Sequence, residues 1–171
     1  MRSEFACRDF DFPSALLYTV PCMKFEGQIL IRAPQPKVWE FFTQIDRVAR
    51  CIPGCQSVES IMGDRYRAVI VETLGIFRVS FATEVKIEAM NEGISINASV
   101  IGSDRKLGSG FRQTLQAMFT QSNAIETRVD LSTEVHFMGK IAGLGYGILK
   151  RKADEAMVKF GEAVRAELEG T

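Results

Sequence analysis

Hydrophobic and polar residues alternate along most of the chain between residues 57 and 138, and this two-residue period predicts β-strands. In the longest run Phe77, Val79 and Phe81 alternate with Arg78 and Ser80. Short glycine-containing or polar turns separate the runs, so neighbouring strands are expected to pair antiparallel. The strands are expected at residues 24–32, 57–61, 65–72, 76–90, 94–101, 111–121 and 125–138.

The period becomes helical between the first and second expected strands. Residues 34–42 open with prolines and place Val38, Phe41 and Phe42 on one side, which predicts a helix. A second short helix is expected over residues 46–51, because the Pro53-Gly54 pair that follows terminates a helix.

A long amphipathic helix is predicted for residues 139–169, at the end of the chain. Four glycines crowd its first turns, and each costs about 1 kcal/mol relative to alanine inside a helix. We expect them because the backbone passes close to a sheet or a ligand there, or because they widen the mouth of a cavity. These glycines are Gly139, Gly143, Gly145 and Gly147. The apolar residues at helical spacing are Ile141, Leu144, Ile148, Leu149, Met157, Phe160, Val164 and Leu168.

This order of elements predicts an α+β fold in which one curved antiparallel sheet wraps around the long C-terminal helix. Two short helices follow the first strand. We expect a single domain at residues 23–171. Residues 1–22 are expected to be an N-terminal extension or leader, and their acidic residues Glu4, Asp9 and Asp11 disfavour a secretory signal.

Charge and cysteine content narrow the function classes. The 171 residues hold 21 basic and 21 acidic side chains, which argues against nucleic acid as a partner because phosphate binding needs a concentrated basic surface. No apolar run approaches the roughly 20 residues needed to span a bilayer. Cys7, Cys22, Cys51 and Cys55 follow no secreted disulfide framework, which predicts a reducing, cytoplasmic environment.

No catalytic, metal or phosphate site emerges from the motifs. Alternation places His136, the single histidine, on the charged face with Glu134, and no nucleophile is available there for a triad. Cys51-x3-Cys55 lacks the second ligand pair of a zinc site. The glycines after residue 138 lack the order of a dinucleotide-binding loop. We therefore expect no catalytic residue, no metal and no cofactor.

The apolar face of the sheet is the candidate ligand-binding site. It is either a filled core or, if the bent sheet and single helix leave space between them, an apolar pocket. Gln113, Thr127 and Thr133 also fall on the inward register, where a ligand's carbonyl or hydroxyl group would satisfy them. The candidate cavity residues are Phe42, Ile52, Phe77, Phe81, Val85, Ile96, Phe111, Gln113, Leu115, Phe119, Val129, Leu131, Val135, Ile141, Leu144 and Ile148.

The mouth of this cavity is expected near Phe42, Ile52 and Pro53, with residues 52–54 as a hinged lid. Replacing Gly54 with valine is then expected to change ligand exchange more than stability. The register predicts that no titratable side chain faces the cavity, with Arg65 and Arg67 as open cases.

Four segments carry a resemblance to a known family: F-E-G-Q-I-L-I-R-A-P at 25–34, V-W-E-F-F at 38–42, C-I-P-G at 51–54 and M-G-K-I-A-G-L-G at 138–145. With the order of elements, they resemble the carbon monoxide dehydrogenase CoxG family of the START and birch-pollen-allergen (Bet v 1-like, SRPBCC) superfamily. The resemblance covers residues 23–169 and implies a helix-grip fold. Phe81-Ala82-Thr83 replaces the family's F-x-G, and the family's membrane-associating tail has no counterpart after Thr171, which puts autonomous anchoring in doubt.

The resemblance implies a non-catalytic role. It implies a protein that holds a lipid or quinone and partners a molybdenum hydroxylase, with delivery of quinone or recruitment to the membrane as its task. Such a protein would be cytoplasmic or peripheral at the inner face of the membrane. Two alternatives stay open: a polyketide cyclase or aromatase-like enzyme that uses the same cavity, and a structural adaptor with a filled core.

Overall fold

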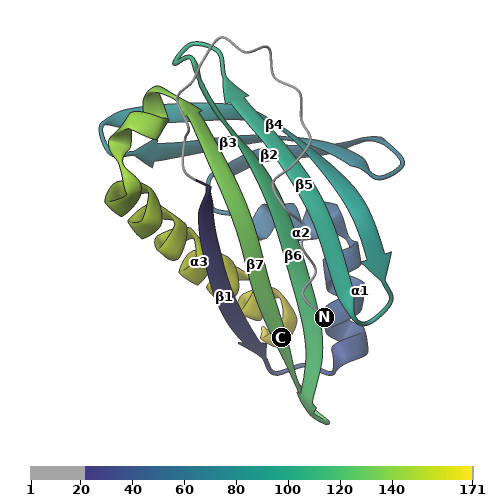
Figure 1. Ribbon diagram of the computed structural model, residues 1–171. Helices are drawn as coiled ribbons and strands as arrows, with labels where there is room; N and C mark the ends of the chain where they lie inside the picture. The colour runs from purple at the N-terminus through teal and green to yellow at the C-terminus, as the bar shows by residue number, and fades with distance from the viewer. Residues whose placement is uncertain (1–21, 171) are drawn as a thin grey trace.

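A computed structural model describes residues 22–170, which form a seven-stranded antiparallel sheet with helices on one side (Figure 1). The order of elements is β1 (Met23–Ile31), α1 (Gln35–Thr43), α2 (Ile45–Cys51), β2 (Cys55–Met62), β3 (Arg65–Leu74), β4 (Phe77–Asn91), β5 (Ser95–Asp104), β6 (Ser109–Asn123), β7 (Glu126–Gly139), η1 (Lys140–Leu144) and α3 (Tyr146–Glu169). The expected α+β architecture is confirmed. The expected extension at 1–22 lies almost wholly outside the described residues.

The strand order across the sheet is β1-β7-β6-β5-β4-β3-β2. Consecutive strands from β2 to β7 are therefore neighbours, as short turns require, whereas β1 pairs with β7 at the far edge. The connection formed by α1 and α2 consequently carries the chain from one edge of the sheet to the other.

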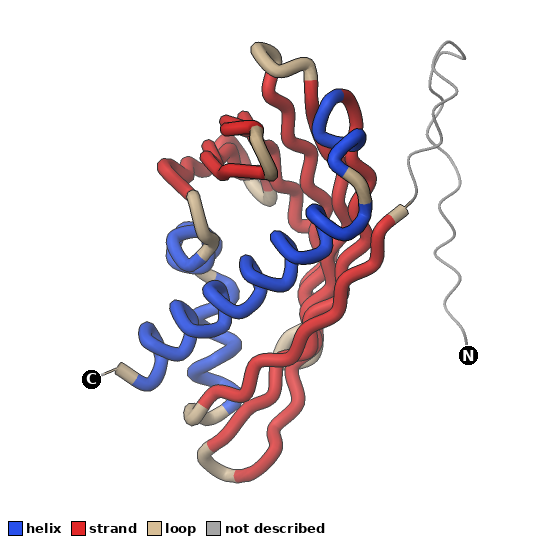
Figure 2. The backbone as a smooth tube through the Cα atoms, turned by 90° about the vertical axis from the view of Figure 1, so that its left-hand side faces the viewer, coloured by secondary structure: helices blue, strands red, loops and turns tan. Residues whose placement is uncertain are grey.

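Helix α3 lies across the concave face of the sheet (Figure 2). Two glycines let the helix approach β1 closely. A Cβ at Gly161 would lie 3.5 Å from Cγ1 of Ile29, and a Cβ at Gly27 would lie only 2.7 Å from Cγ of Met157. The helix is thus seated along β1, at one side of the concave face.

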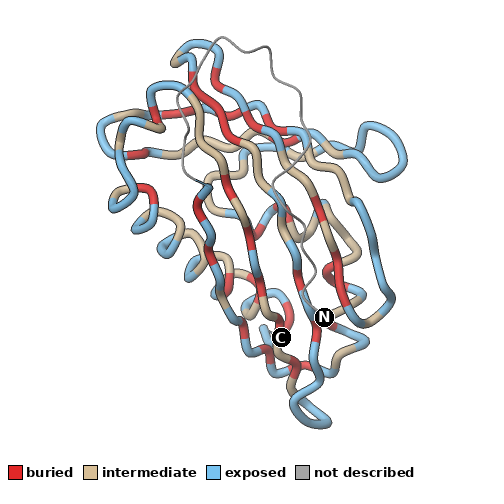
Figure 3. The backbone as a smooth tube through the Cα atoms, in the orientation of Figure 1, coloured by how far each residue is buried: buried red, intermediate tan, exposed pale blue. Residues whose placement is uncertain are grey.

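The buried side chains form two apolar clusters on this face, and buried positions alternate with exposed ones along the strands (Figure 3). One cluster joins α1, α2 and the C-terminal half of α3 to the sheet, with Phe42 packed edge-on against Phe119. The other joins η1 and the start of α3 to the opposite end of the strands, with Phe81 packed edge-on against Phe111.

Two sequence predictions about local structure need correction. The α-helix begins at Tyr146 instead of near Gly139, because a five-residue 3-10 helix precedes it and glycines with positive φ flank that turn, Gly139 at 76° and Gly145 at 84°. The polar turn expected at residues 102–110 is shorter, since β5 continues to Asp104 and β6 begins at Ser109. The Asp104 carboxylate accepts hydrogen bonds from the Ser80 and Leu107 amides and holds this turn tight.

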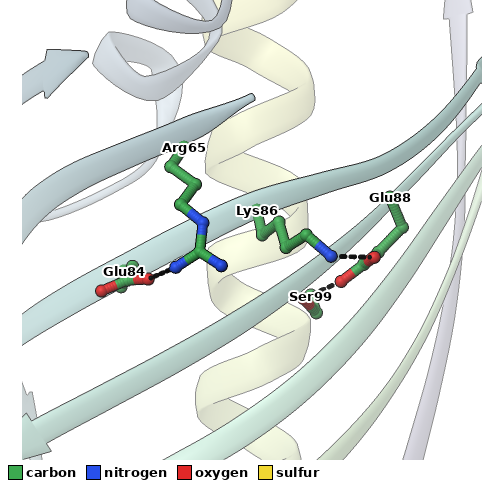
Figure 4. A network of polar contacts seen from close by, with 5 residues as sticks. All are labelled: Arg65, Glu84, Lys86, Glu88 and Ser99. Atoms are coloured by element: carbon green, nitrogen blue, oxygen red, sulfur yellow. Dashed lines mark hydrogen bonds and ion pairs between the residues drawn. The ribbon is translucent and has the colours of Figure 1, made fainter. Parts of the chain in front are cut away.

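The face of the sheet turned away from α3 carries exposed polar contacts (Figure 4). Arg65 pairs with Glu84 at 3.0 Å and Lys86 with Glu88 at 2.7 Å, while the Ser99 hydroxyl donates to Glu88 at 2.6 Å. The hydrogen bond from Lys86, followed by that from Ser99, lowers the pKa of Glu88. Exposed pairs of this kind contribute below about 1 kcal/mol each, so this face serves solubility more than stability.

Candidate functional site

A row of four inward-facing side chains crosses the middle of the sheet. Strand pairing sets Gln113 of β6 beside Val100 of β5, Val100 beside Val85 of β4, and Val85 beside Tyr66 of β3. All four are half-buried, whereas Val135, which continues the row onto β7, is buried. We call these four residues the central row.

The central row adjoins the cluster around Phe111, against which Val100 packs, and lies away from β1, along which α3 is seated. Leu115 and Ile70, which face the same way on neighbouring rows, are also half-buried. Apolar side chains on the concave face of a sheet are expected to be buried when the core is filled. Their partial exposure shows that solvent reaches the middle of this face.

One ion pair joins α3 to the far side of the concave face. Lys152 Nζ of α3 lies 3.5 Å from a carboxylate oxygen of Glu72 on β3, and 3.6 Å from a carboxylate oxygen of Glu155 on its own helix. Glu72 faces inward, since it pairs with the fully buried Val79. The pair therefore spans the open side of the concave face.

The candidate cavity residues do not share one environment. Nine are buried in the two clusters: Phe42, Phe81, Ile96, Phe111, Phe119, Val129, Leu131, Val135 and Ile141. Six are half-buried: Phe77, Val85, Gln113, Leu115, Leu144 and Ile148. Ile52 is exposed. Phe42 was expected at a cavity mouth and instead packs inside the core against the Phe119 and Phe160 rings.

The inward polar residues Gln113, Thr127 and Thr133 differ in whether they have a hydrogen-bonding atom free for a ligand. Thr127 is fully buried and its hydroxyl donates to the Ala33 carbonyl. Thr133 donates its single hydroxyl proton to the Thr114 carbonyl, so its oxygen must accept from Gln113. This order fixes the amide nitrogen of Gln113 toward Thr133. The Gln113 carbonyl oxygen is left as the acceptor that a ligand can reach.

Sequence reasoning missed Tyr66, Val100 and Glu72. In β3 the inward residues are Tyr66, Ala68, Ile70, Glu72 and Leu74, as their pairing with inward residues of β4 shows. Arg65 and Arg67 therefore face outward, where they pair with Glu84 and Glu59. The four consecutive apolar residues 68–71 hid the alternation. Arg65 and Arg67 lie on the same parity, and this was the signal that pointed to the correct face.

The segment Ile52-Pro53-Gly54 is tied to β3. The Val71 amide donates to the Gly54 carbonyl at 2.9 Å, and the Cys55 amide donates to the Ile52 carbonyl at 3.2 Å. Gly54 has φ of 77°, and a Cβ there would lie 2.2 Å from the Val71 carbonyl oxygen. A valine at Gly54 would therefore lower stability as well as alter any ligand exchange, because the backbone itself would have to move.

The sequence also matches a protein-family model directly. The model for the CoxG subunit of carbon monoxide dehydrogenase matches residues 27–169, which is most of the chain. The chain belongs to the carbon monoxide dehydrogenase CoxG family. No curated protein is significantly similar to it in sequence.

Solved structures place this CoxG-family chain among START-like and Bet v 1-like folds. A conserved protein from Geobacillus kaustophilus superimposes with a TM-score of 0.79 at 18% identity, covering 86% of this chain and 95% of its own. The Zhui aromatase/cyclase from Streptomyces sp. R1128 gives 0.66 at 14%, with coverage of 87% and 94%. A START superfamily protein from Mycobacterium smegmatis gives 0.65 at 10%, with coverage of 85% and 97%. These likenesses confirm the helix-grip fold.

Within this CoxG-family fold, the groups that most often carry catalysis lie away from the central row. His136 is on the outward parity of β7, beside Arg112 of β6. Burial, and the neighbouring Glu167 charge, raise the pKa of the Cys51 thiol, and burial raises the pKa of Cys55, so both thiols are protonated near neutral pH and are poor nucleophiles.

The described part of this CoxG-family chain holds neither a candidate metal cluster nor a membrane-spanning helix. Residues 22–170 contain no cluster of three or more histidine, cysteine or acidic side chains with the geometry to hold a metal ion. None of the helices in that range has both the length and the apolar content that crossing a bilayer requires.

Proposed function

We propose that this protein carries one hydrophobic ligand, an isoprenoid quinone or another lipid, between the concave face of its sheet and helix α3. The central row is the observation that carries the proposal. Its apolar members, Val85 and Val100, are half-buried at the middle of a face whose two ends are well packed. A ligand that covered them would gain the hydrophobic free energy that the protein itself leaves unrealised.

Gln113 gives this ligand a polar end. Its amide nitrogen is held by Thr133, so its carbonyl oxygen is positioned before any ligand binds. Preorganised groups of this kind fix the orientation of a ligand in a largely apolar site. A hydroxyl group on the ligand would donate to this oxygen, and the second N–H of the amide would serve a carbonyl group. Both groups occur on the head of a quinone in its two redox states.

The proposed partner follows from family membership. A CoxG-family protein is expected to serve an enzyme, here a molybdenum hydroxylase of the carbon monoxide dehydrogenase type. In this role the protein is cytoplasmic and makes peripheral contact with the membrane from which the lipid or quinone comes. Co-purification of the tagged full chain with the hydroxylase from its own host tests the partner.

The ligand is tested by native mass spectrometry of the full chain purified from its own host, followed by organic extraction and identification of what is released. The proposal predicts one quinone or lipid molecule per chain. A chain that is empty when isolated and forms no adduct with added menaquinone would refute the carrier role.

A second candidate, a cyclase-type enzyme, is favoured by one observation. Tyr66 and the Glu72–Lys152 pair face the concave side, where sequence reasoning expected no titratable group. Phenol, carboxylate and ammonium groups can move protons on a bound aromatic substrate. Incubation with linear polyketide mimics tests this reading. Turnover that Tyr66→Phe abolishes would favour the enzyme over the carrier.

A further inference from the structure

One end of the sheet carries exposed apolar side chains that the fold does not use. Ile76, in the turn between β3 and β4, is 89% exposed, and Tyr146, the first residue of α3, is 58% exposed. The two positions belong to one surface, because a Cβ at Gly75 would lie 3.0 Å from Cδ2 of Leu144 in η1. We call the surface formed by Ile76, Leu144 and Tyr146 the apolar tip.

The glycines of this region support a surface role. Gly139 and Gly145 have positive φ and are explained by backbone conformation. Gly143 and Gly147 are not, since a Cβ at either would meet nothing within 4 Å. The close approach to sheet or ligand expected for all four is thus found at Gly139 alone, where a Cβ would lie 2.0 Å from the Gly108 carbonyl oxygen. Gly143 and Gly147 leave backbone exposed beside Tyr146.

Basic side chains surround the apolar tip. Arg78 follows the β3–β4 turn, Arg105 and Lys106 lie in the β5–β6 turn, and Lys140 opens η1; all four are exposed. None of them forms an ion pair with a carboxylate in the described range 22–170.

Strand pairing confirms that these basic residues share one end of the sheet. Leu74 pairs with Phe77, Asp104 with Ser109, and Ser109 with Gly139, so the three connections meet there. A shallow hollow of about 340 Å³ between Arg78 and Lys106 also opens at this end. Asp104 lines it too, but its carboxylate is engaged by the Ser80 and Leu107 amides.

The opposite end has a different charge. Its turns hold Ile94 and Ile125, 60% and 70% exposed, and the charged residues next to them in the sequence are Glu92 and Glu126. Arg32, exposed after the end of β1, is a basic residue at this end. Exposed isoleucines therefore occur at both ends, whereas a group of four exposed basic residues surrounds the apolar tip.

We propose that the apolar tip seats this protein on an anionic lipid bilayer. Ile76 and Tyr146 would enter the boundary between headgroups and acyl chains, where tyrosine is favoured because one end of its ring is apolar and the other polar. Arg78, Lys106 and Lys140 would lie at the level of the lipid phosphates. Two or three protruding side chains suit a bilayer surface better than a protein partner, whose interface needs a larger apolar centre.

This inference deepens the membrane contact within the proposed function by naming the surface that makes it. The tip adjoins the start of α3, at one end of the concave face, so a docked protein would hold that end against the source of its ligand. Docking itself requires no ligand, so membrane docking by the apolar tip and ligand carriage on the concave face can be refuted separately.

The test is flotation of the full chain with vesicles of phosphatidylcholine alone or mixed with phosphatidylglycerol. We expect binding to the mixed vesicles, weaker at higher salt, and reduced about tenfold by Ile76→Asp, because an apolar side chain that the bilayer buries is lost. Ile125→Asp is the matched control, since it places the same charge on an exposed isoleucine at the opposite end.

Three results would overturn the proposal: no binding to the mixed vesicles, equal binding by wild type and Ile76→Asp, or equal losses in Ile76→Asp and Ile125→Asp. Loss of hydroxylase capture by Ile76→Asp without any vesicle binding would assign the tip to a protein partner instead. Ile76→Asp should keep the native-mass adduct with quinone. If the wild type also forms no adduct with quinone, the result would count against the carrier role but not against membrane docking by the apolar tip.

Discussion

The side-chain amide of Gln113 is an inward polar group with hydrogen-bonding capacity to offer a ligand. Gln113→Leu is expected to weaken binding of a quinone or hydroxylated lipid about fivefold, the equivalent of one net hydrogen bond of roughly 1 kcal/mol. Gln116→Leu, on the outward face of the same strand, is the control. Titration followed by native mass spectrometry measures both, and equal affinity in the two variants would remove Gln113 from the site.

The carboxyl group of Asp104 is expected to make the stability of the fold depend on pH. Hydrogen bonds from the Ser80 amide first, and then the Leu107 amide, lower its pKa below the ordinary 3.8. The stabilisation is therefore present above the unfolded-state value and is lost as the pH falls through the lower folded-state value. Urea unfolding from pH 5 downward should show a steeper loss in wild type than in Asp104→Asn, which keeps one acceptor but cannot titrate. Parallel curves would contradict this role.

At the scale of elements, the glycine that joins α2 to β2 is more constrained than its sequence suggests. Gly54→Ala is expected to cost about 3 kcal/mol, from the left-handed backbone and the contact with the Val71 carbonyl. Gly63→Ala, at φ of 61° with open space around it, should cost about 1 kcal/mol. Chemical denaturation measures both, and equal losses would show that conformation alone decides.

The strands and helices were largely predictable because period-two and period-3.6 patterns are strong in this chain. Their ends were not. The β5–β6 turn is short because Asp104 accepts two backbone hydrogen bonds, and α3 starts late because Gly139 and Gly145 adopt positive φ. Both effects depend on contacts between residues that sequence periodicity does not register.

At the scale of the whole molecule, Lys152 and Glu72 join α3 to β3 across the open side of the concave face. Glu72→Gln is expected to change the free energy of unfolding by less than about 1 kcal/mol, because the pair is partly solvated. It should nevertheless speed ligand release, since the charged link across the opening is lost. Stopped-flow transfer of bound quinone to vesicles measures the rate, with Glu59→Gln, in the outer pair with Arg67, as control. Unchanged release would show that the pair does not control exit.

The site was only partly predictable at this scale. The alternation of apolar and polar residues identified the concave face. Whether a ligand can contact Phe42 or Val85 depends on the position of α3. That position is set by Gly27 and Gly161, whose missing side chains let the helix approach β1 and leave the middle of the sheet less covered. A one-dimensional pattern records which face a residue occupies and carries no information about how far the opposite layer extends.

Filling the central row tests most directly whether the ligand binds on the concave face. Val85→Phe and Val100→Phe each add a ring at a half-buried position, so the folded state should accept them with a small loss of stability, larger for Val100, which packs against the cluster around Phe111. Titration with menaquinone, read by native mass spectrometry, should give a one-to-one adduct in wild type and little or none in these variants. Full binding by stable, folded Val85→Phe and Val100→Phe proteins would contradict the claim that the ligand lies on this row.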